Sequence, residues 1–423
     1  MELRYLGSRR VHTVSLAPRL PTTACLAIAR PPRFVPIALR RARMTQGNRL
    51  RRIVAISDFC TRVPPLPGAW LDDDPPPART PSAAAVRGGY LERLPLAVVR
   101  AGLADSAEIW SFTGDDTPTG LSTQSGQPAH RRFRADPHPT PYGSAQMMAH
   151  LARHGAPDIL CIWGLGVTQS FLAACPDAIK IYNSLDVDAI RIPPDVSRHI
   201  DIFLTGSVQQ STDVLHSHPD ALVEILPIGP EFASPETFFP TGAPKDIDVI
   251  YVAAAQGYKR HDILFDALAA LPRDIRCLCI FGYGELADDL RNRADRMALN
   301  VEFVGPPGVS HDEVNRLMNR ARIGVVCGID DGAPAILTEY MLAGLPVLAN
   351  ADLRCGLQYI TPDTGRAARP ADFAAALAEM LQTPDAFCPR DVVMRNWTWP
   401  QSVNRLRQLI GTARQRRKNG VLN

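Results

Sequence analysis

The stretch of residues 323–350, IGVVCGIDDGAPAILTEYMLAGLPVLAN, constrains the fold of this chain more than any other. An apolar run at its start and another at its end predict two short strands. Between them, an acidic glycine turn leads to Pro334, which suits the first position of a helix, and Gly344 with Pro346 would end that helix about three turns later. Strand, turn, helix and strand in this order are the repeat unit of a parallel α/β sheet.

Two carboxylates make this unit a candidate site, because Asp331 lies in the turn and Glu339 lies inside the helix. At about 100° per residue, Leu337, Tyr340 and Met341 cluster on one side of the helix, and Glu339 falls at the edge of that face. A carboxylate there needs a hydrogen-bond partner or a water-filled cleft. The free helix N-terminus nearby would attract anions, phosphates above all. The alternative is a glutamate that is simply solvated.

The arrangement resembles the signature of family 4 (group 1) glycosyltransferases: an acid, Gly, any residue, Pro, four residues and Glu, followed by Gly-x-Pro-Val. In this chain the matching residues are Asp331-Gly332-Ala333-Pro334, Glu339 and Gly344-Leu345-Pro346-Val347. The first acid is Asp where the family has Glu, which shortens its reach by about 1.5 Å. The resemblance implies an α/β chain of GT-B architecture, with two Rossmann-like, doubly wound parallel-sheet domains that face each other across a cleft.

The same resemblance implies roles for individual residues. Glu339 would accept hydrogen bonds from the ribose of a nucleotide-sugar donor, and Asp331 from the hydroxyls of its sugar. Lys259, followed by Arg260, matches the family's lysine that meets the donor diphosphate, and a fixed ammonium stabilises the charge that develops on a leaving diphosphate. Where the family usually has an arginine, this chain has Ala254.

Backbone groups would complete the donor site. The amides of the helix after Pro334, at Ala335 and Ile336, would hold the diphosphate together with Lys259. The candidate catalytic residues are therefore Asp331, Lys259 and Glu339.

Glycine pairs and turns supply the remaining donor-binding candidates. Gly88-Gly89 opens a helix after the first strand, where the family lets its backbone approach the sugar nucleotide; the alternative is a flexible loop end. Gly282 and Gly284 allow close packing against a phosphate or the neighbouring domain, and the turn at Gly305 would lie against the base.

Gly282 and Gly284 also form a GxGxxA pattern with Ala287, which is a weak dinucleotide signal. A nicotinamide enzyme would place an acid just past the next strand. Here that strand, residues 301–304, runs instead into Gly305 and two prolines, so we reject a dehydrogenase.

Metal binding is not expected. Asp186-Val-Asp188 has the DxD form by which another class of glycosyltransferases holds a divalent cation, but acidic tripeptides are common and the second half of the chain resembles GT-B, which generally needs no metal. His130 and His138 are isolated in the sequence. We therefore expect no cofactor and no metal, with the nucleotide sugar as co-substrate.

The resemblance covers residues 247–395 closely and 53–232 more loosely. We expect a basic, poorly ordered extension at 1–50, an acceptor domain at 51–232, a donor domain at 233–395, and a crossover helix with a basic tail at 396–423. Residues 1–43 hold nine arginines and one acid, which fits either a transit peptide or a chain that starts at Met44.

Local patterns predict the elements of both domains. Apolar runs predict strands at 53–57, 108–112, 159–163, 179–182, 202–205 and 223–227 and then at 248–252, 276–281 and 301–304. Helices are predicted at 147–154, 261–271, 286–297, 311–320, 372–381 and 401–417. Residues 114–143, rich in Pro, Thr, Gly and His, predict an irregular excursion.

Composition limits the partners. A formal charge of +3 over 423 residues, without a basic stripe interleaved with aromatics, argues against nucleic acid. The nine scattered cysteines form no CxxC pair and predict buried thiols in a reducing compartment. No apolar run is long enough to span a bilayer. We expect a cytoplasmic protein, with peripheral contact between its basic tail and the inner membrane face left open.

These inferences predict a glycosyltransferase that moves a sugar from a nucleotide sugar to a carbohydrate or glycan acceptor, as in glycan or polysaccharide biosynthesis. By resemblance, the reaction would retain anomeric configuration. Two alternatives remain: a GT-B epimerase or hydrolase acting on the nucleotide sugar itself, and a catalytically silent GT-B module that binds sugar nucleotide.

Overall fold

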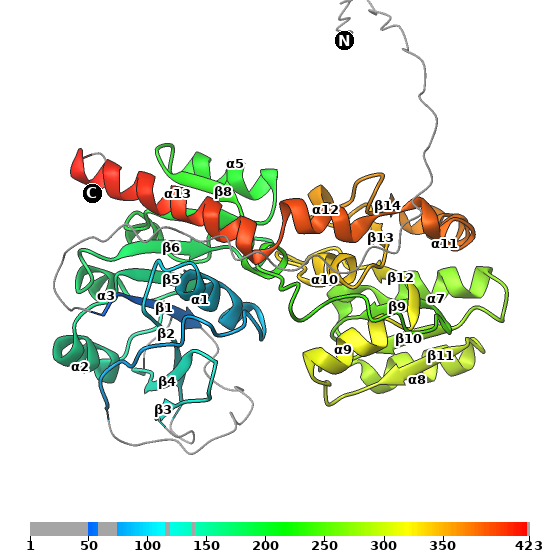
Figure 1. The fold of residues 1–423 in the computed structure, drawn as a ribbon, viewed down its shortest axis with the longest axis horizontal. Helices are drawn as coiled ribbons and strands as arrows, with labels where there is room; N and C mark the ends of the chain where they lie inside the picture. Colours follow the sequence, from blue (N-terminus) through cyan, green and yellow to red (C-terminus); the bar gives the residue numbers. More distant parts are fainter. Residues whose placement is uncertain (1–49, 58–73, 115–118, 138–139, 421–423) are drawn as a thin grey trace, which may run out of the picture. The chain divides into compact units, whose positions relative to one another are not determined.

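The structure is a computed structural model that describes residues 50–57, 74–114, 119–137 and 140–420, all within one compact unit (Figure 1). Residues 1–49 of the expected N-terminal extension, which include Met44, lie outside the described residues, as does His138. The described part contains two sheets, and each is built around strands that are buried on both faces.

The first sheet has eight strands in the order β3-β4-β2-β1-β5-β6-β7-β8. They are β1 (Arg52–Ser57), β2 (Ser106–Thr113), β3 (Gly120–Ser122), β4 (Ala129–Arg134), β5 (Ile159–Trp163), β6 (Ile179–Asn183), β7 (Ile202–Thr205) and β8 (Leu222–Ile225). All neighbours are parallel except β3, which runs antiparallel to β4. The sheet is thus doubly wound, as predicted, with an antiparallel edge strand that the prediction lacked.

The helices of the first half cover both faces of this sheet. They are α1 (Tyr90–Arg100), α2 (Ala145–His154), α3 (Gln169–Ala173), α4 (Pro194–Ser197), α5 (Val208–Ser217) and α6 (Ile228–Glu231). Successive residues of a strand point to opposite faces, so Ile53 and Ala55 join the core beneath α1, whereas Val54 and Ile56 join the core with α2 and α3. Burial on both faces explains why β1 is continuously apolar from Ile53 to Ile56.

The second sheet has six parallel strands in the order β11-β10-β9-β12-β13-β14. They are β9 (Ile247–Val252), β10 (Cys277–Ile280), β11 (Val301–Val304), β12 (Ala321–Val326), β13 (Val347–Asn350) and β14 (Gly365–Ala368). Counted within the sheet, this is the order 3-2-1-4-5-6 of a Rossmann-type sheet. The direction of winding therefore reverses between β9 and β12.

Seven helices of the second half are α7 (His261–Ala270), α8 (Ala287–Arg296), α9 (His311–Met318), α10 (Ile336–Leu342), α11 (Phe373–Gln382), α12 (Pro389–Asn396) and α13 (Trp399–Lys418). Apolar side chains of α7, α8 and α11 fill one face of the second sheet, and those of α9, α10 and α12 fill the other. Both sheets are therefore covered on both faces, as expected for a parallel α/β fold. None of the helices described is long and apolar enough to cross a membrane.

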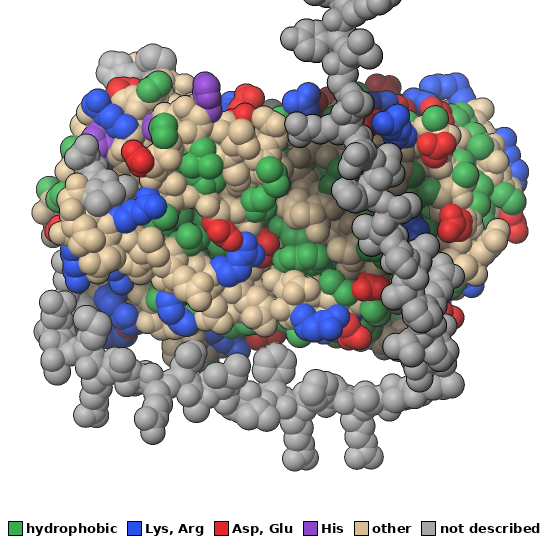
Figure 2. Space-filling model, turned by 90° about the horizontal axis from the view of Figure 1, so that it is seen from above, with side chains coloured by type: hydrophobic (Ala, Val, Ile, Leu, Met, Phe, Trp, Pro, Cys, Tyr) green, Lys and Arg blue, Asp and Glu red, His purple; other side chains and the backbone are tan. Residues whose placement is uncertain are grey.

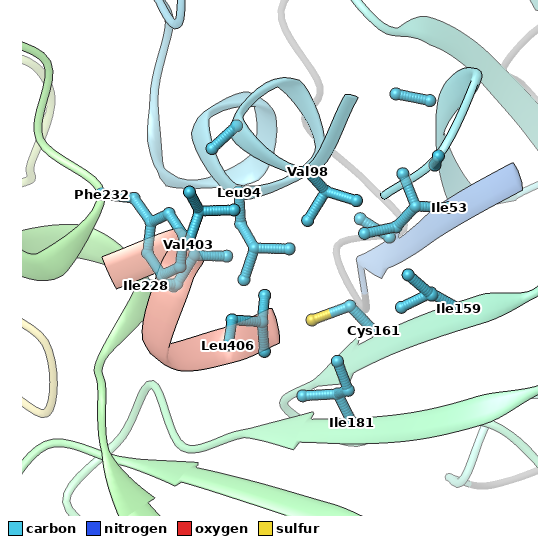
Figure 3. Close-up of a cluster of buried hydrophobic side chains, with 14 of the residues drawn as sticks. Ile53, Leu94, Val98, Ile159, Cys161, Ile181, Ile228, Phe232, Val403 and Leu406 are labelled. Atoms are coloured by element: carbon cyan, nitrogen blue, oxygen red, sulfur yellow. The ribbon is translucent and has the colours of Figure 1, made fainter. Parts of the chain in front are cut away.

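The last helix, α13, returns to the first sheet as predicted and packs on α1, β6 and β7 (Figure 1). Val403 and Leu406 enter the same core as Ile53, Leu94 and Ile181, which Figure 3 shows in close-up. This contact holds the last helix against the first sheet.

Several arginines of α13 bond to the first half. Arg405 pairs with Glu231 at 3.2 Å, and Arg417 pairs with Asp201 at 2.5 Å. These guanidiniums are therefore engaged within the protein. On the face shown in Figure 2, basic and acidic side chains are interspersed, and the described part of that face has no extended patch of one sign.

Strands predicted at 159–163, 202–205 and 301–304 have the observed bounds, and the other predicted strands and helices are confirmed to within a few residues. The prediction of an irregular segment at 114–143 is wrong for its described part, which contains β3 and β4. The sequence-based predictions also missed α3, α4, α5, α6, α12 and β14. Six cysteines are buried as free thiols, as predicted, but Cys388 is exposed.

Candidate functional site

One charged pair lies at the carboxyl ends of β9 and β12, which are neighbours in the centre of the second sheet. After β9 the chain forms a short 3-10 helix, η1 (Gly257–Lys259), and after β12 it forms the acidic turn. Lys259 Nζ donates a hydrogen bond to Asp331 Oδ2, and both side chains are more than four-fifths buried. Because winding reverses between these strands, the pair sits at the switch point where α/β sheets bind ligands.

Lys259 is held as a cation. Burial alone would lower the pKa of Lys259, but the negative charge of Asp331, with Tyr258 and the hydrogen bond to Asp331, outweighs burial and raises it. The ammonium also lies 4.8 Å from the centroid of the Tyr258 ring. A permanently charged lysine in surroundings of low dielectric is suited to bind a diphosphate.

A second charged pair joins the two halves of the molecule. Arg93 Nη2, on α1, donates to Glu339 Oε1, on α10, at 2.5 Å. Arg93 is 1% exposed and Glu339 is 8% exposed. The alternative of a solvated glutamate is therefore wrong, because its carboxylate is buried against a guanidinium from the other sheet.

Arg93 also ties Glu339 to the predicted glycine pair. Its Nε donates to the carbonyl of Gly88 at 2.8 Å, while Nη1 is buried with no hydrogen-bond partner among the residues described. Gly88 has a φ of +96°, which favours glycine, and Gly89 is the N-cap of α1. Gly89 N–H donates to Glu92 Oε2 at 2.7 Å, which fixes the start of the helix.

Sequence reasoning missed Arg93. It is the one charged residue in the run from Arg93 to Val99, which is otherwise apolar and entirely buried. A lone arginine on a buried helical face needs a partner, and that requirement was the available signal.

The acidic turn itself packs against the first half. A Cβ on Gly332 would collide with the carbonyl oxygens of Leu185 and Asp186, so only glycine fits there. Similarly, a Cβ on Gly229 would lie 2.7 Å from the carbonyl of Ala333. The turn that carries Asp331 is thus held between the two sheets.

Helix α10 is held in place by Tyr340, whose hydroxyl accepts from Val252 N–H at 2.7 Å and donates to the carbonyl of Ile250 at 3.2 Å. It begins at Ile336, with Ala335 as N-cap, two residues later than Pro334 suggested. It spans seven residues, about two turns and not three, so its dipole is short. Any diphosphate site there therefore depends mainly on Lys259.

The other glycine candidates line up along the carboxyl edge of the second sheet. A Cβ on Gly284 would strike the backbone of Ala255, and one on Gly305 would strike the carbonyl of Phe281. A Cβ on Gly282 would meet no atom within 4 Å. Gly284 and Gly305 therefore serve to bring the loops after β9, β10 and β11 together.

Among the described residues, no hydrogen bond or ion pair joins Arg260 to Lys259 or Asp331. Its guanidinium pairs with Asp262, at 2.8 Å from Nη2 to Oδ2, at the start of α7. The neighbouring His261 is buried against Tyr251, and burial lowers the pKa of His261 to about 4, so the ring is neutral.

Two groups of side chains have carboxylate or imidazole atoms that could in principle bind a metal ion. In the DxD tripeptide, Asp186 Oδ2 accepts from Arg191 Nη1 at 2.6 Å and is already paired. Asp74, His150 and His154 bring ligand atoms close together, but Arg131 and Arg153 both donate to the Asp74 carboxylate. Two guanidiniums on one carboxylate oppose a further cation.

The fold thus places a charged pair at the switch point of a Rossmann-type sheet, where sheets of this kind bind their ligands. Residues 234–386 match the family described as glycosyl transferases group 1. A comparison with curated protein sequences finds no significant match.

Solved structures resemble the chain over most of its length. A sucrose-phosphate synthase from Thermosynechococcus elongatus is 18% identical with a TM-score of 0.62, covering 86% of this chain and 98% of its own. HepE of Anabaena, in complex with UDP and glucose, is 14% identical with a TM-score of 0.57, covering 86% and 100%. The pneumococcal O-GlcNAc transferase GtfA, in complex with UDP and GlcNAc, is 11% identical with a TM-score of 0.51, covering 64% and 61%.

The structural similarities show that the chain has a GT-B fold. In this chain the two sheets have eight and six strands. In the second half of the chain, residues 234–386 match the group 1 glycosyl transferase family, and the structures similar over most of the chain share its fold.

Proposed function

We propose that this enzyme transfers a hexosyl or related group to a hydroxyl of a carbohydrate acceptor, with retention of anomeric configuration and without a metal. The observation that carries the proposal is the Lys259–Asp331 pair at the switch point between β9 and β12. It offers a charged donor and a charged acceptor of hydrogen bonds where a diphosphate and its sugar would meet.

The donor would bind mainly to the second half. Lys259 would contact the diphosphate, Asp331 the hydroxyls of the transferred sugar, and Glu339 the ribose. Arg93 holds Glu339 Oε1, which leaves Oε2 of the carboxylate for ribose hydroxyls. UDP is the first nucleotide to test, because HepE and GtfA are similar in fold and were solved with UDP.

The proposed chemical step is the one that the resemblance to family 4 glycosyltransferases implies. The acceptor oxygen attacks the anomeric carbon on the face from which the diphosphate leaves, while the bond between that carbon and the phosphate oxygen breaks. The departing phosphate oxygen takes the acceptor proton, so no protein base is required. Lys259 stabilises the negative charge that grows on the diphosphate.

To test the function, the full chain is incubated with UDP-glucose, UDP-GlcNAc or GDP-mannose. Each donor is supplied with and without a mixture of mono- and oligosaccharide acceptors. Mass spectrometry then measures the masses of the products. A product heavier by one sugar residue, formed only with acceptor and unaffected by chelator, is expected. Release of free sugar or an epimerised donor at the same rate without acceptor would contradict transfer. Loss of turnover with chelator would contradict the metal-free mechanism.

A further inference from the structure

A cavity of about 220 Å³ lies beside the glycine pair, outside the residues assigned above to the donor's charges. It is bounded by the start of α1, by the turn between β3 and β4, and by His311, the first residue of α9. The cavity is thus lined by both halves of the molecule. It is smaller than the roughly 300–1,000 Å³ of pockets for drug-sized ligands, so it suits a single ring better than a chain.

The lining is polar but carries no lysine or arginine among the described residues. The β3–β4 turn contributes Ser122, Gln124 and Gln127, and the facing walls contribute Glu92 and His130. Hydroxyl, amide and imidazole groups suit a ligand that both donates and accepts hydrogen bonds. The described part of the wall has no cationic side chain that could pair with a phosphate or carboxylate. It is also too polar to bind an acyl chain.

The three titratable groups in the wall, Glu92, His130 and His311, all have a pKa shifted toward the neutral form, and for His311 the cause is burial. Burial raises the pKa of Glu92, although Gly89 N–H bonds to its carboxylate. Burial, with Arg132, lowers the pKa of His130 to about 4. At neutral pH the His130 ring, 3.8 Å from Glu92 Oε1, is therefore an uncharged donor and acceptor.

One polar atom in the wall lacks a partner. The amide oxygen of Gln127 is buried and accepts no hydrogen bond within the described part of the chain. Buried amide oxygens are almost always bonded, so a ligand hydroxyl in the cavity would satisfy it.

From these contacts we propose that the cavity binds one ring of the acceptor, and that the acceptor's reacting end is a neutral, hydroxyl-rich sugar. The inference rests on the transferase function proposed above. The glycine pair lines the cavity and is joined through Arg93 to Glu339, so a sugar here lies next to the donor residues. Its specificity would come from the β3–β4 turn.

The test uses the full chain saturated with UDP and a panel of methyl hexosides (glucoside, galactoside, mannoside and N-acetylglucosaminide) as probes in saturation-transfer NMR. Gln127→Ala removes the unpaired acceptor, and Gln124→Trp, at an exposed position, fills the cavity. The matched control is Gln209→Ala, because Gln209 is an exposed glutamine that lines a different cavity of about 620 Å³.

At least one hexoside is expected to bind the wild type, about 3- to 10-fold more weakly to Gln127→Ala, and not at all to Gln124→Trp. UDP affinity and binding to Gln209→Ala should not change. The proposal is overturned if no hexoside binds while UDP does, if Gln124→Trp still binds it, or if Gln209→Ala is the variant that loses it. If Gln127→Ala weakens UDP-glucose but not UDP, the cavity holds the donor's sugar and the proposal also fails. Failure of the wild type to bind UDP would instead count against the proposed function.

Discussion

Replacing Arg93 by methionine is expected to lower the free energy of unfolding by about 3–5 kcal/mol, because it leaves the buried Glu339 carboxylate without its partner. Methionine keeps most of the aliphatic volume, so the loss reports the charge and not a cavity. Urea unfolding followed by circular dichroism measures the change.

The matched control is Arg316→Met. Arg316 Nη2 and Glu313 Oε1 are also 2.5 Å apart, but the side chain of Arg316 is 59% exposed. Exposed ion pairs contribute little to stability because water and salt screen them, so this variant should unfold almost as the wild type does. The double variant Arg93→Met/Glu339→Met should recover much of the stability. Equal, small losses for Arg93→Met and Arg316→Met would show that the pair across the two sheets is not buried in solution.

Lys259→Ala should lower kcat for sugar transfer by about 10²–10³, the usual loss when one preorganised group facing a developing charge is removed. Lys259 faces Asp331 at the switch point and stays protonated, so its charge is in place before the donor binds. Steady-state kinetics with the donor identified by the product screen measure the effect.

Lys259→Arg keeps the charge and should restore part of the rate, whereas Lys418→Ala, at the end of α13, should leave kcat unchanged. If Lys259→Ala retains kcat within about threefold of the wild type, Lys259 does not stabilise the leaving diphosphate.

Most strands of the second sheet were predictable because they are short runs rich in apolar residues, and two of them, β10 and β13, are buried along their whole length. The strand β14, with the sequence GRAA, has no such apolar run and was missed. Similarly, β4 has the sequence AHRRFR, which reads as a solvated segment. Arg131 is nevertheless buried there, since Glu108 and Asp74 accept its hydrogen bonds. Local patterning does not reveal partners that are distant in sequence.

The residues of the candidate site also fall into two groups, those that the sequence identified and one that only the structure shows. Asp331, Glu339 and Lys259 lie in short motifs, so their residue types and spacing identified them. Arg93 lies 246 positions from Glu339, and its role depends on how two sheets pack. It brings a guanidinium next to the donor residues in a chain that has Ala254 where the family usually has arginine. Only the three-dimensional structure shows this.

The central claim is that Glu339, on a helix at the junction of the two sheets, binds the nucleotide of the donor. Isothermal titration calorimetry of the wild type with UDP, GDP and ADP tests it, alongside Glu339→Gln and the exposed control Glu379→Gln. We predict that one nucleotide binds the wild type and the control equally, and binds Glu339→Gln about 10- to 100-fold more weakly, because hydrogen bonds to the ribose lose their charged acceptor. Unchanged affinity in Glu339→Gln, or no binding of any nucleotide to the wild type, would contradict the claim.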